Sequence, residues 1–320
     1  ESIAAGQRYL LVHIAGGVCL MAGILLHYHH TGSLAVTAPD PQQGLAFYLT
    51  LAGVLLNAAV PPLSAWLTDA YPEATITGAV FLSAFTTKTA VYVLIRAYPG
   101  TEILVWLGAI MSISGVIYAV LENDCRRLLA YHIICQVGYM VAGVGMGTQL
   151  ALNGAAAHAF TNILYKGLLF MAAGAVIYIT GRRKLTELGG LYKTMPLTMV
   201  LFMIGAVSIS AFPLFSGFVS KSMVMTAALQ QDYHGIWLML LFASAGVFHH
   251  AGIKIPYFAF FAHDSGLRAS DPPANMLLAM LTAAALCLSI GIYPALLYQW
   301  LPFSLDYQPY DVTHVLAQTQ

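Results

Sequence analysis

Long hydrophobic segments separated by short polar connections run along the whole chain of 320 residues. A bilayer core about 30 Å thick is crossed by about 20 apolar residues in an α-helix. Nine segments satisfy that criterion, and the connections between them are too short to form a soluble domain. The pattern predicts an all-α, polytopic membrane protein with about nine transmembrane helices, expected at residues 9–28, 44–66, 74–97, 102–122, 128–147, 150–179, 196–228, 235–262 and 274–299.

Two of these segments carry prolines that would interrupt a continuous helix. The second contains Pro61 and Pro62 shortly after Asn57, and the seventh contains Pro213 followed by Gly217. Proline removes a helical hydrogen bond, and lipid cannot satisfy the freed carbonyl, so such breaks survive where protein or water surrounds them. We expect two broken helices, with a simple proline kink as the alternative at each. Both segments contain a Pro-Leu pair followed closely by serine, which hints at the internal repeats of ion transporters.

Composition strengthens the membrane assignment. Hydrophobic residues make up 59% of the chain and charged residues only 8%, against roughly 25% in soluble domains. The formal net charge is zero, which argues against electrostatic attraction to nucleic acid or acidic substrates. The four cysteines have neither metal-ligand nor redox spacing, and we interpret them as small buried hydrophobes.

The basic residues in the connections predict an orientation. With nine crossings, eight of the nine lysines and arginines in the connections or at the ends of the apolar segments fall on one side, and only Arg96, at the end of the third segment, falls on the other. Basic residues are enriched in cytoplasmic loops, so this side is predicted to be cytoplasmic, in a bacterial inner membrane. We expect the polar tail 307–320 to lie on the surface. Because the first residue is Glu1 rather than Met, we expect a fragment or a processed product. The residues on the predicted cytoplasmic side are Arg8, Arg126, Arg127, Arg182, Arg183, Lys184, Lys193 and Arg268.

Four lysines lie inside the apolar segments: Lys88, Lys166, Lys221 and Lys254. A charged side chain at the centre of a membrane helix costs about 2.5–3.5 kcal/mol on insertion scales, so four of them indicate a use. The proton affinity of a buried lysine depends on the charges beside it, which suits it to carry protons. Lys254 lies nearest the end of its segment and is the best placed to reach the interface.

The clearest polar pattern within one segment joins His158, Asn162 and Lys166 at four-residue intervals. Residues four apart share a helix face, with a rise of about 6 Å between neighbours. A histidine, an amide and a lysine in file are typical of a proton relay completed by water. A polar stripe that only holds helices together is the alternative.

The remaining histidines permit several interpretations. His250 and Lys254 share a face beside His249, where an exit route for protons and a polar helix end are both open. We interpret the three histidines at the end of the first segment as a solvated interfacial cluster rather than a metal site, and two near predicted cytoplasmic helix starts as structural. The cluster is His27, His29 and His30, and the structural pair is His13 and His132.

The carboxylates fall at the ends of the predicted spans or in the connections between them, and none lies in the middle of a span. Either Glu122 reaches inward, or the charge that balances the lysines comes from helices or a partner outside this chain. The chain also lacks a nucleophile elbow, a phosphate loop, a cysteine-rich cluster and a plausible pair of haem ligands. We therefore expect a protein that is not an enzyme and that holds no cofactor or metal.

Several stretches resemble the antiporter-like membrane subunits shared by respiratory complex I, Mrp-type multisubunit cation/proton antiporters and membrane-bound hydrogenases. Residues 62–73 (PLSAWLTDAYPE) are similar to the signature PLxxWLPDAxxxAP of these subunits. Residues 253–264 are most similar to the D-like members of the Mrp antiporters. Further matches, in the order of the family, are residues 135–140 (CQVGYM), 158–170 (HAFTNILYKGLLF) and 212–221 (FPLFSGFVSK).

The resemblance implies a fold with fourteen helices and two inverted five-helix repeats, each with one broken helix. This chain would correspond to the sixth to fourteenth helices, as a single transmembrane domain over residues 1–306. Within it, residues 1–97 would be a truncated first repeat, residues 98–265 the second repeat, and residues 266–306 the last helix.

The resemblance also implies roles for individual residues. Lys88 would be the lysine of the eighth helix, His158 and Lys166 the relay of the eleventh, and Lys221 the terminal lysine that passes protons outward. Asn57 stands where the family usually has a lysine on the first broken helix, and Asn162 where many members have a second histidine. The family glutamate that pairs with the first lysine would precede Glu1. The second half of the pathway is therefore better supported than the first.

These observations predict a subunit of a multisubunit antiporter that exchanges protons for sodium or another monovalent cation, with other membrane subunits as partners. A proton-pumping subunit of a complex I-like or hydrogenase-like redox complex is the alternative within the same fold. A non-conducting assembly subunit is a third possibility, and Asn57 gives it weight. An intramembrane enzyme would need a catalytic pair that the sequence lacks.

Overall fold

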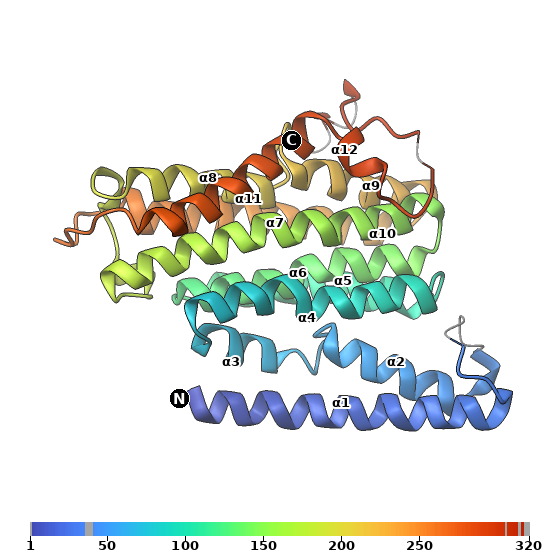
Figure 1. Cartoon of the computed structure of the whole chain (residues 1–320). Helices are drawn as coiled ribbons and strands as arrows, with labels where there is room; N and C mark the ends of the chain where they lie inside the picture. The colour runs from blue at the N-terminus through green and yellow to red at the C-terminus, as the bar shows by residue number, and fades with distance from the viewer. Residues whose placement is uncertain (1, 36–40, 305, 313–314, 317–320) are drawn as a thin grey trace.

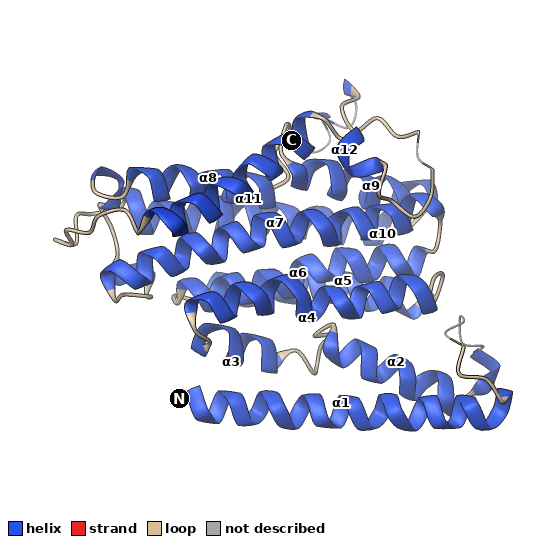
Figure 2. Ribbon diagram, in the orientation of Figure 1, coloured by secondary structure: helices blue, strands red, loops and turns tan. Residues whose placement is uncertain are grey.

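The computed structural model describes residues 2–35, 41–304, 306–312, 315 and 316. Within these ranges the chain is helical, apart from its loops and one isolated β-bridge (Figure 2). The helices lie side by side as a bundle, with α1 along one edge and the connections gathered at the two ends (Figure 1). The all-α fold predicted from the sequence is confirmed.

Seven helices among the described residues are long and apolar enough to cross a membrane. The shortest have 19 residues and are therefore about 28 Å long. In α6, 94% of the residues in its most apolar stretch are buried, so this helix forms the centre of the bundle. The seven are α1 (Ser2–Thr31), α4 (Ile76–Ala97), α5 (Ile103–Leu121), α6 (Cys125–Met146), α7 (Gln149–Thr180), α10 with its extension (His234–Phe261) and α11 (Ala274–Ile292).

The two segments with internal prolines are broken helices rather than kinked ones. The first consists of α2 (Leu45–Asn57) and α3 (Ala65–Glu73), and the second of α8 (Pro196–Ile209) and α9 (Ser216–Gln230). Pro61 and Pro62 lie in the first break, and Pro213 lies in the second. With the seven long helices, these two pairs give the nine crossings that the hydrophobic pattern predicted.

The two breaks have the same local backbone geometry. Ala59 and Ala211 hold positive φ angles of 60° and 57°, which few residues other than glycine adopt. The next amide in each break donates to a carbonyl five residues earlier, from Val60 to Leu55 and from Phe212 to Val207. This shared geometry agrees with an internal repeat, although the division into residues 1–97, 98–265 and 266–306 stays a prediction.

Two predicted spans end differently from a regular helix. α10 (His234–Val247) continues as wider π-helical turns over Phe248–Lys254 and Tyr257–Phe261. Pro256, between these turns, has no N–H to donate to a regular helical ladder. The last predicted span ends as α11 at Ile292, because Pro294 follows, and α12 (Ala295–Tyr298) is a separate short helix.

The tail that begins at residue 307 returns to the bundle. Tyr307 is only 8% exposed, and the ring of Tyr310 stacks on that of Phe218 in α9 with 5.4 Å between centroids. The hydroxyl of Tyr310 donates to the carbonyl of Gly291. The surface position expected for the tail therefore does not hold for its first residues, while residues 313–314 and 317–320 lie outside the described part of the chain.

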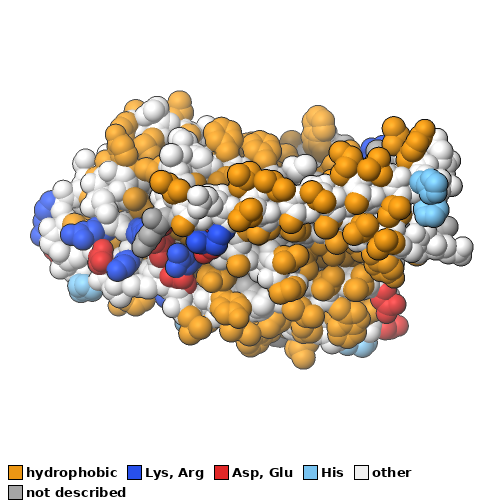
Figure 3. All heavy atoms as spheres, turned by 90° about the horizontal axis from the view of Figure 1, so that it is seen from below, with side chains coloured by type: hydrophobic (Ala, Val, Ile, Leu, Met, Phe, Trp, Pro, Cys, Tyr) orange, Lys and Arg blue, Asp and Glu red, His pale blue; other side chains and the backbone are white. Residues whose placement is uncertain are grey.

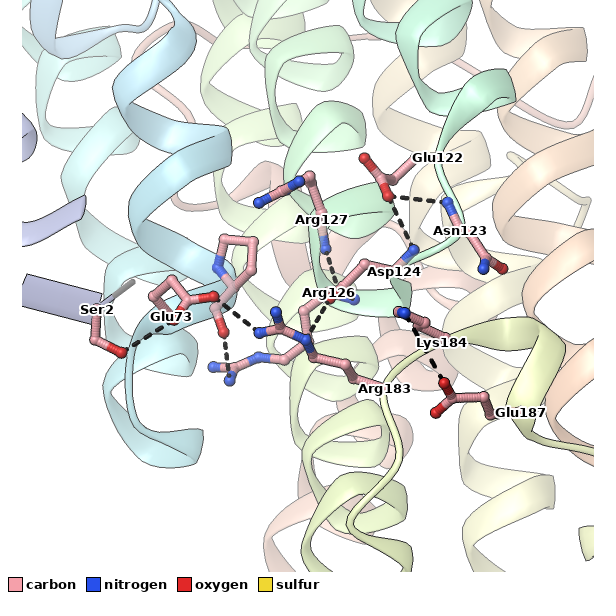
Figure 4. Close-up of polar contacts among 11 residues, drawn as sticks. Ser2, Glu73, Glu122, Asn123, Asp124, Arg126, Arg127, Arg183, Lys184 and Glu187 are labelled. Atoms are coloured by element: carbon pink, nitrogen blue, oxygen red, sulfur yellow. Dashed lines mark hydrogen bonds and ion pairs between the residues drawn. The ribbon is translucent and has the colours of Figure 1, made fainter. Parts of the chain in front are cut away.

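A network of charged side chains ties helices together at the end of the bundle predicted to be cytoplasmic (Figure 4). Arg183, after α7, contacts Glu73 of α3 through Nη1 and Asp124 through Nε, each at 2.9 Å. Asp124 also caps α6, because its side chain accepts from the amides of Arg126 and Arg127. The buried guanidinium of Arg126 donates to the carbonyl of Pro72 at 3.0 Å.

Another ion pair lies in the exposed loop after the π-helical turns. Nη1 of Arg268 donates to Oδ1 of Asp264 at 2.9 Å. This hydrogen bond and the amide of Gly266 lower the pKa of the Asp264 carboxyl to about 2.

On the face shown in Figure 3, hydrophobic side chains cover the middle, while many Lys and Arg side chains gather toward the left end. This distribution fits a membrane-spanning bundle with charged ends.

Candidate proton pathway

Lys88 lies on α4, which begins with Thr75 as its N-cap. The side chain is only 5% exposed, and Nζ donates to the carbonyl of Ser83 at 2.8 Å. Ser83 is five residues earlier on the same helix, so Lys88 bends along α4 within the bundle. The prediction that this lysine is buried rather than at an interface agrees with its position.

His158, Asn162 and Lys166 are fully buried on α7. Thr148 caps the start of α7, and Gly181 ends it in the left-handed conformation, so the helix runs unbroken past all three. Nζ of Lys166 donates to the carbonyl of Leu129 on α6 at 3.0 Å. Lys166 therefore connects α7 with the centre of the bundle.

A network of neutral polar side chains surrounds His158. Its Nδ1 lies 2.9 Å from the hydroxyl of Ser220 on α9, and its Nε2 lies 3.4 Å from the hydroxyl of Tyr165. Tyr165 in turn donates to Oε1 of Gln136 on α6 at 3.0 Å, and accepts from the amide of Asn162 at 3.0 Å. These contacts join α6, α7 and α9 through groups that donate and accept protons.

The sequence interpretation did not single out Gln136, Tyr165 or Ser220. Each lies inside a stretch that carries the family resemblance, and that was the available signal. The contacts of Gln136 with Tyr165 and of Ser220 with His158 join different helices, so spacing along one helix could not predict them. Asn162 donates to the hydroxyl of Tyr165 and does not connect His158 directly with Lys166. The phenol of Tyr165 therefore joins the group of side chains expected to relay protons.

Lys221 is fully buried on α9, just after the second break. Its Nζ donates at 2.7 Å to the carbonyl of Ile209, the last residue of α8, and lies 5.3 Å from the centre of the Tyr139 ring. The lysine thus satisfies a carbonyl that the break frees. Gly217 allows this close approach, since a Cβ there would lie 1.9 Å from the carbonyl oxygen of Ser208.

The first break is held by different side chains. The indole of Trp66 donates to the carbonyl of Leu56 at 3.2 Å. Nδ2 of Asn57 donates to the carbonyl of Gly53, one turn earlier on its own helix, at 3.3 Å. The side chain at position 57, an amide bonded to its own helix, therefore places no proton carrier beside the first break.

Lys88, Lys166 and Lys221 are held by backbone carbonyls rather than carboxylates. The ion pairs identified in the described part of the chain involve residues at the ends of the bundle instead. Glu122 does not reach inward, because its Oε1 accepts from the amides of Asn123 and Asp124, each at 2.9 Å. Glu122 therefore makes no contact with Lys88, Lys166 or Lys221, although its charge acts on Lys254 at the end of the bundle.

His250 and Lys254 lie apart from this group, on the π-helical turns after α10. His250 is buried, and Lys254 is half-buried. Nζ of Lys254 donates to the carbonyls of Val120 and Glu122, at 2.9 and 2.8 Å, at the end of α5. Lys254 is therefore anchored at the predicted cytoplasmic end of the bundle, as its position in the sequence suggested.

Two broken helices, three buried lysines held by backbone carbonyls and a network of neutral polar side chains around His158 define an antiporter-like membrane subunit. The chain belongs to the family described as "NADH:quinone oxidoreductase/Mrp antiporter, TM", whose model matches residues 1–249. The resemblance that the sequence motifs indicated is thereby confirmed.

Individual relatives come from both branches of this family. The chain is 35% identical to NADH-quinone oxidoreductase subunit N of Desulforudis audaxviator, over 75% of this chain and 51% of that protein. It is 33% identical to the D component of the Na(+)/H(+) antiporter of Alkalihalophilus pseudofirmus, over 76% and 55% respectively. It thus matches about half the length of these relatives.

A solved structure has the same fold. A chain in the structure of the Mrp complex from Dietzia sp. superposes with a TM-score of 0.84 at 25% identity. The match covers 92% of this chain and 66% of that one. The predicted antiporter-like fold is confirmed by this match.

Proposed function

We propose that this chain is a subunit of a multisubunit monovalent cation/proton antiporter in a bacterial inner membrane. Its own part is to move protons along buried lysine and histidine side chains, coupled to the exchange of sodium or another monovalent cation. It works with other membrane subunits, and no covalent chemistry or cofactor is assigned to it. The name of the relative from Alkalihalophilus pseudofirmus supports this choice.

The observation that carries the proposal is the burial of three lysines without a carboxylate partner among the described contacts. Lys166 and Lys221 have no exposed surface, and Lys88 has 5%. Ionisable groups inside a membrane are costly and mark ion or proton routes. Burying three ionisable groups lowers the stability of the bundle, so a protein with a purely structural role would not be expected to keep them.

The proposed route runs from Lys88 to Lys166 and through the network around His158 to Lys221. Charges on Lys88 and Lys221 both act electrostatically on Lys166, which lies within range of each. Ser220 and Tyr165 touch the two ring nitrogens of His158, so this imidazole can accept a proton on one side and release it on the other.

Replacing Lys221 tests the route at its last step. Everted membrane vesicles containing the whole complex are assayed for collapse of a pH gradient on adding sodium, in cells lacking other antiporters. Lys221→Met keeps most of the volume but removes the proton carrier, and Lys193→Met removes a lysine from a loop at the predicted cytoplasmic end. We expect loss of exchange only in Lys221→Met, with assembly intact in both.

Two other results would point elsewhere. Equal activity in Lys221→Met and wild type would make the chain a non-conducting assembly subunit, the role that Asn57 favours. A wild-type complex without any response to monovalent cations would favour a redox-coupled proton pump. The similarity to NADH-quinone oxidoreductase subunit N supports that second candidate, and proton pumping driven by a reduced substrate would test it.

A further inference from the structure

His132 is an unusual polar side chain outside the proposed route. It is fully buried on α6, and neither of its ring nitrogens has a hydrogen-bond partner among the described residues. An unsatisfied buried polar group costs about 1–3 kcal/mol. A histidine that only filled space would be expected to pair at least one nitrogen, so the structural role inferred from its position does not account for this side chain.

The position of His132 links the proposed route to a second group of histidines. On one side, Lys166 donates to the carbonyl of Leu129, one turn before His132 on α6. On the other side, the ring of His250 lies 6.1 Å from the ring of His132, centre to centre. No hydrogen bond joins the two rings directly, and the unpaired nitrogens of His132 could bind a water molecule that bridges them.

The charged groups that act on His132 come from the helices packed around it. Lys166 on α7, Lys221 on α9, and His250 and Lys254 on the π-helical turns all lie within electrostatic range. No carboxylate is among them. A proton on His132 is therefore pushed by its neighbours toward whichever one is neutral, which favours transfer over storage.

The chain of histidines reaches the surface through His249. Its Nδ1 lies 3.1 Å from Nδ1 of His250, so one ring donates to the other. His249 is exposed and, with His250 and Lys254, lines a cavity of about 300 Å³. Because Lys254 is bonded to the last carbonyls of α5, this cavity lies toward the predicted cytoplasmic end. π-helical turns of this kind often occur at functional sites.

We infer that His249, His250 and His132 form a branch that takes up protons from this cavity and delivers them to Lys166. The inference rests on the proposed function, since it supplies the same lysine. The branch joins the route after Lys88 and so bypasses the first broken helix, where Asn57 carries no proton. It gives the second half of the pathway a supply of its own.

Hydration of His132 tests the branch without any measurement of transport. The assembled complex, with nitrogen-labelled histidine, is studied in liposomes by solid-state NMR with magnetisation transfer from water. The signal lost in His132→Gln identifies His132. We expect it to receive magnetisation from water about as readily as the exposed histidines. If His132 receives no magnetisation from water, the inference is overturned, even if the complex proves to be an antiporter. If His132 does receive it, the inference is supported, even if the antiport assay fails.

Chemical rescue tests whether protons pass through position 250, and it does not need His132 to be changed. His250→Ala opens space beside the cavity, and His29→Ala is the control at an exposed site. We expect proton-coupled exchange to fall at least about tenfold in His250→Ala. Added imidazole should restore most of the rate, whereas dimethylimidazolium, which cannot carry a proton, should not. An unchanged rate, rescue by both compounds or rescue by neither would overturn the branch.

Discussion

Replacing Gly217 with alanine should displace the lysine at the end of the proposed route. A Cβ at Gly217 would lie 1.9 Å from the carbonyl oxygen of Ser208, whereas real Cβ contacts are at least 3.0 Å, so α9 must move by about 1.1 Å. Both atoms that collide belong to the rigid junction between α8 and α9, and no flexible side chain can give way. The start of α9 therefore has to shift as a unit.

The shift is large compared with the contact that holds Lys221. Nζ lies 2.7 Å from the carbonyl of Ile209, and an added displacement of about 1.1 Å takes the pair out of hydrogen-bonding range. Overpacking costs about 1–3 kcal/mol, and loss of a hydrogen bond to a charged group costs about 1.5–3 kcal/mol. A misplacement of about 1 Å can slow a transfer step about a hundredfold.

The measurement compares Gly217→Ala with Gly167→Ala, because a Cβ at Gly167 meets nothing within 4 Å. Sodium-driven proton exchange is followed in vesicles by a pH-sensitive dye, and thermal unfolding of the purified complex gives the stability. We expect Gly217→Ala to lose most exchange and to unfold at a lower temperature, while Gly167→Ala matches wild type. Normal exchange and stability in Gly217→Ala would refute the argument that the close junction positions Lys221.

Three further substitutions test contacts at the predicted cytoplasmic end. Arg126→Gln removes a buried donor to the carbonyl of Pro72, and should destabilise the complex by about 1–3 kcal/mol in chemical unfolding. Asp271→Ala removes the carboxylate that accepts from two amides at the start of α8. It should lower the free energy of unfolding by about 1–2 kcal/mol in the same assay. Replacing a surface aspartate without such contacts should change that free energy by no more than a few tenths of a kcal/mol. Arg268→Gln should return the pKa of Asp264 from about 2 toward 3.8, measured by carboxyl NMR titration. Because the folded pKa is the lower one, this ion pair stabilises the loop above pH 3.8 and loses its effect as pH falls through about 2.

The lengths of the apolar segments were enough to predict the helices, because a bilayer requires nearly continuous apolar runs. Pro61, Pro62 and Pro213 located the interruptions, since a proline cannot donate to a helical ladder, but they left a kink and a break both open. The burial of Lys166 and Lys221 also followed from their place within these runs. These predictions depend only on residues near one another in the sequence.

The partners of the buried groups could not be predicted in this way. Lys221 bonds Ile209, and Lys166 bonds Leu129, through backbone carbonyls that every residue possesses. Only the packing of the helices selects which carbonyl is near. For the same reason His132 was taken for a structural residue, although both its nitrogens are unpaired within the described part of the chain.

The three lysines held by carbonyl oxygens are electrostatically coupled to one another. Carbonyl dipoles soften the charge of an ammonium group but do not cancel it, so Lys88, Lys166 and Lys221 continue to repel one another through the low-dielectric core. On the proposed route, a proton arriving at Lys166 would raise the energy of protons already on its neighbours and would drive one of them onward. Ion movement at one end of the bundle would then be sensed at the other as a change of electrostatic potential, with little movement of the backbone.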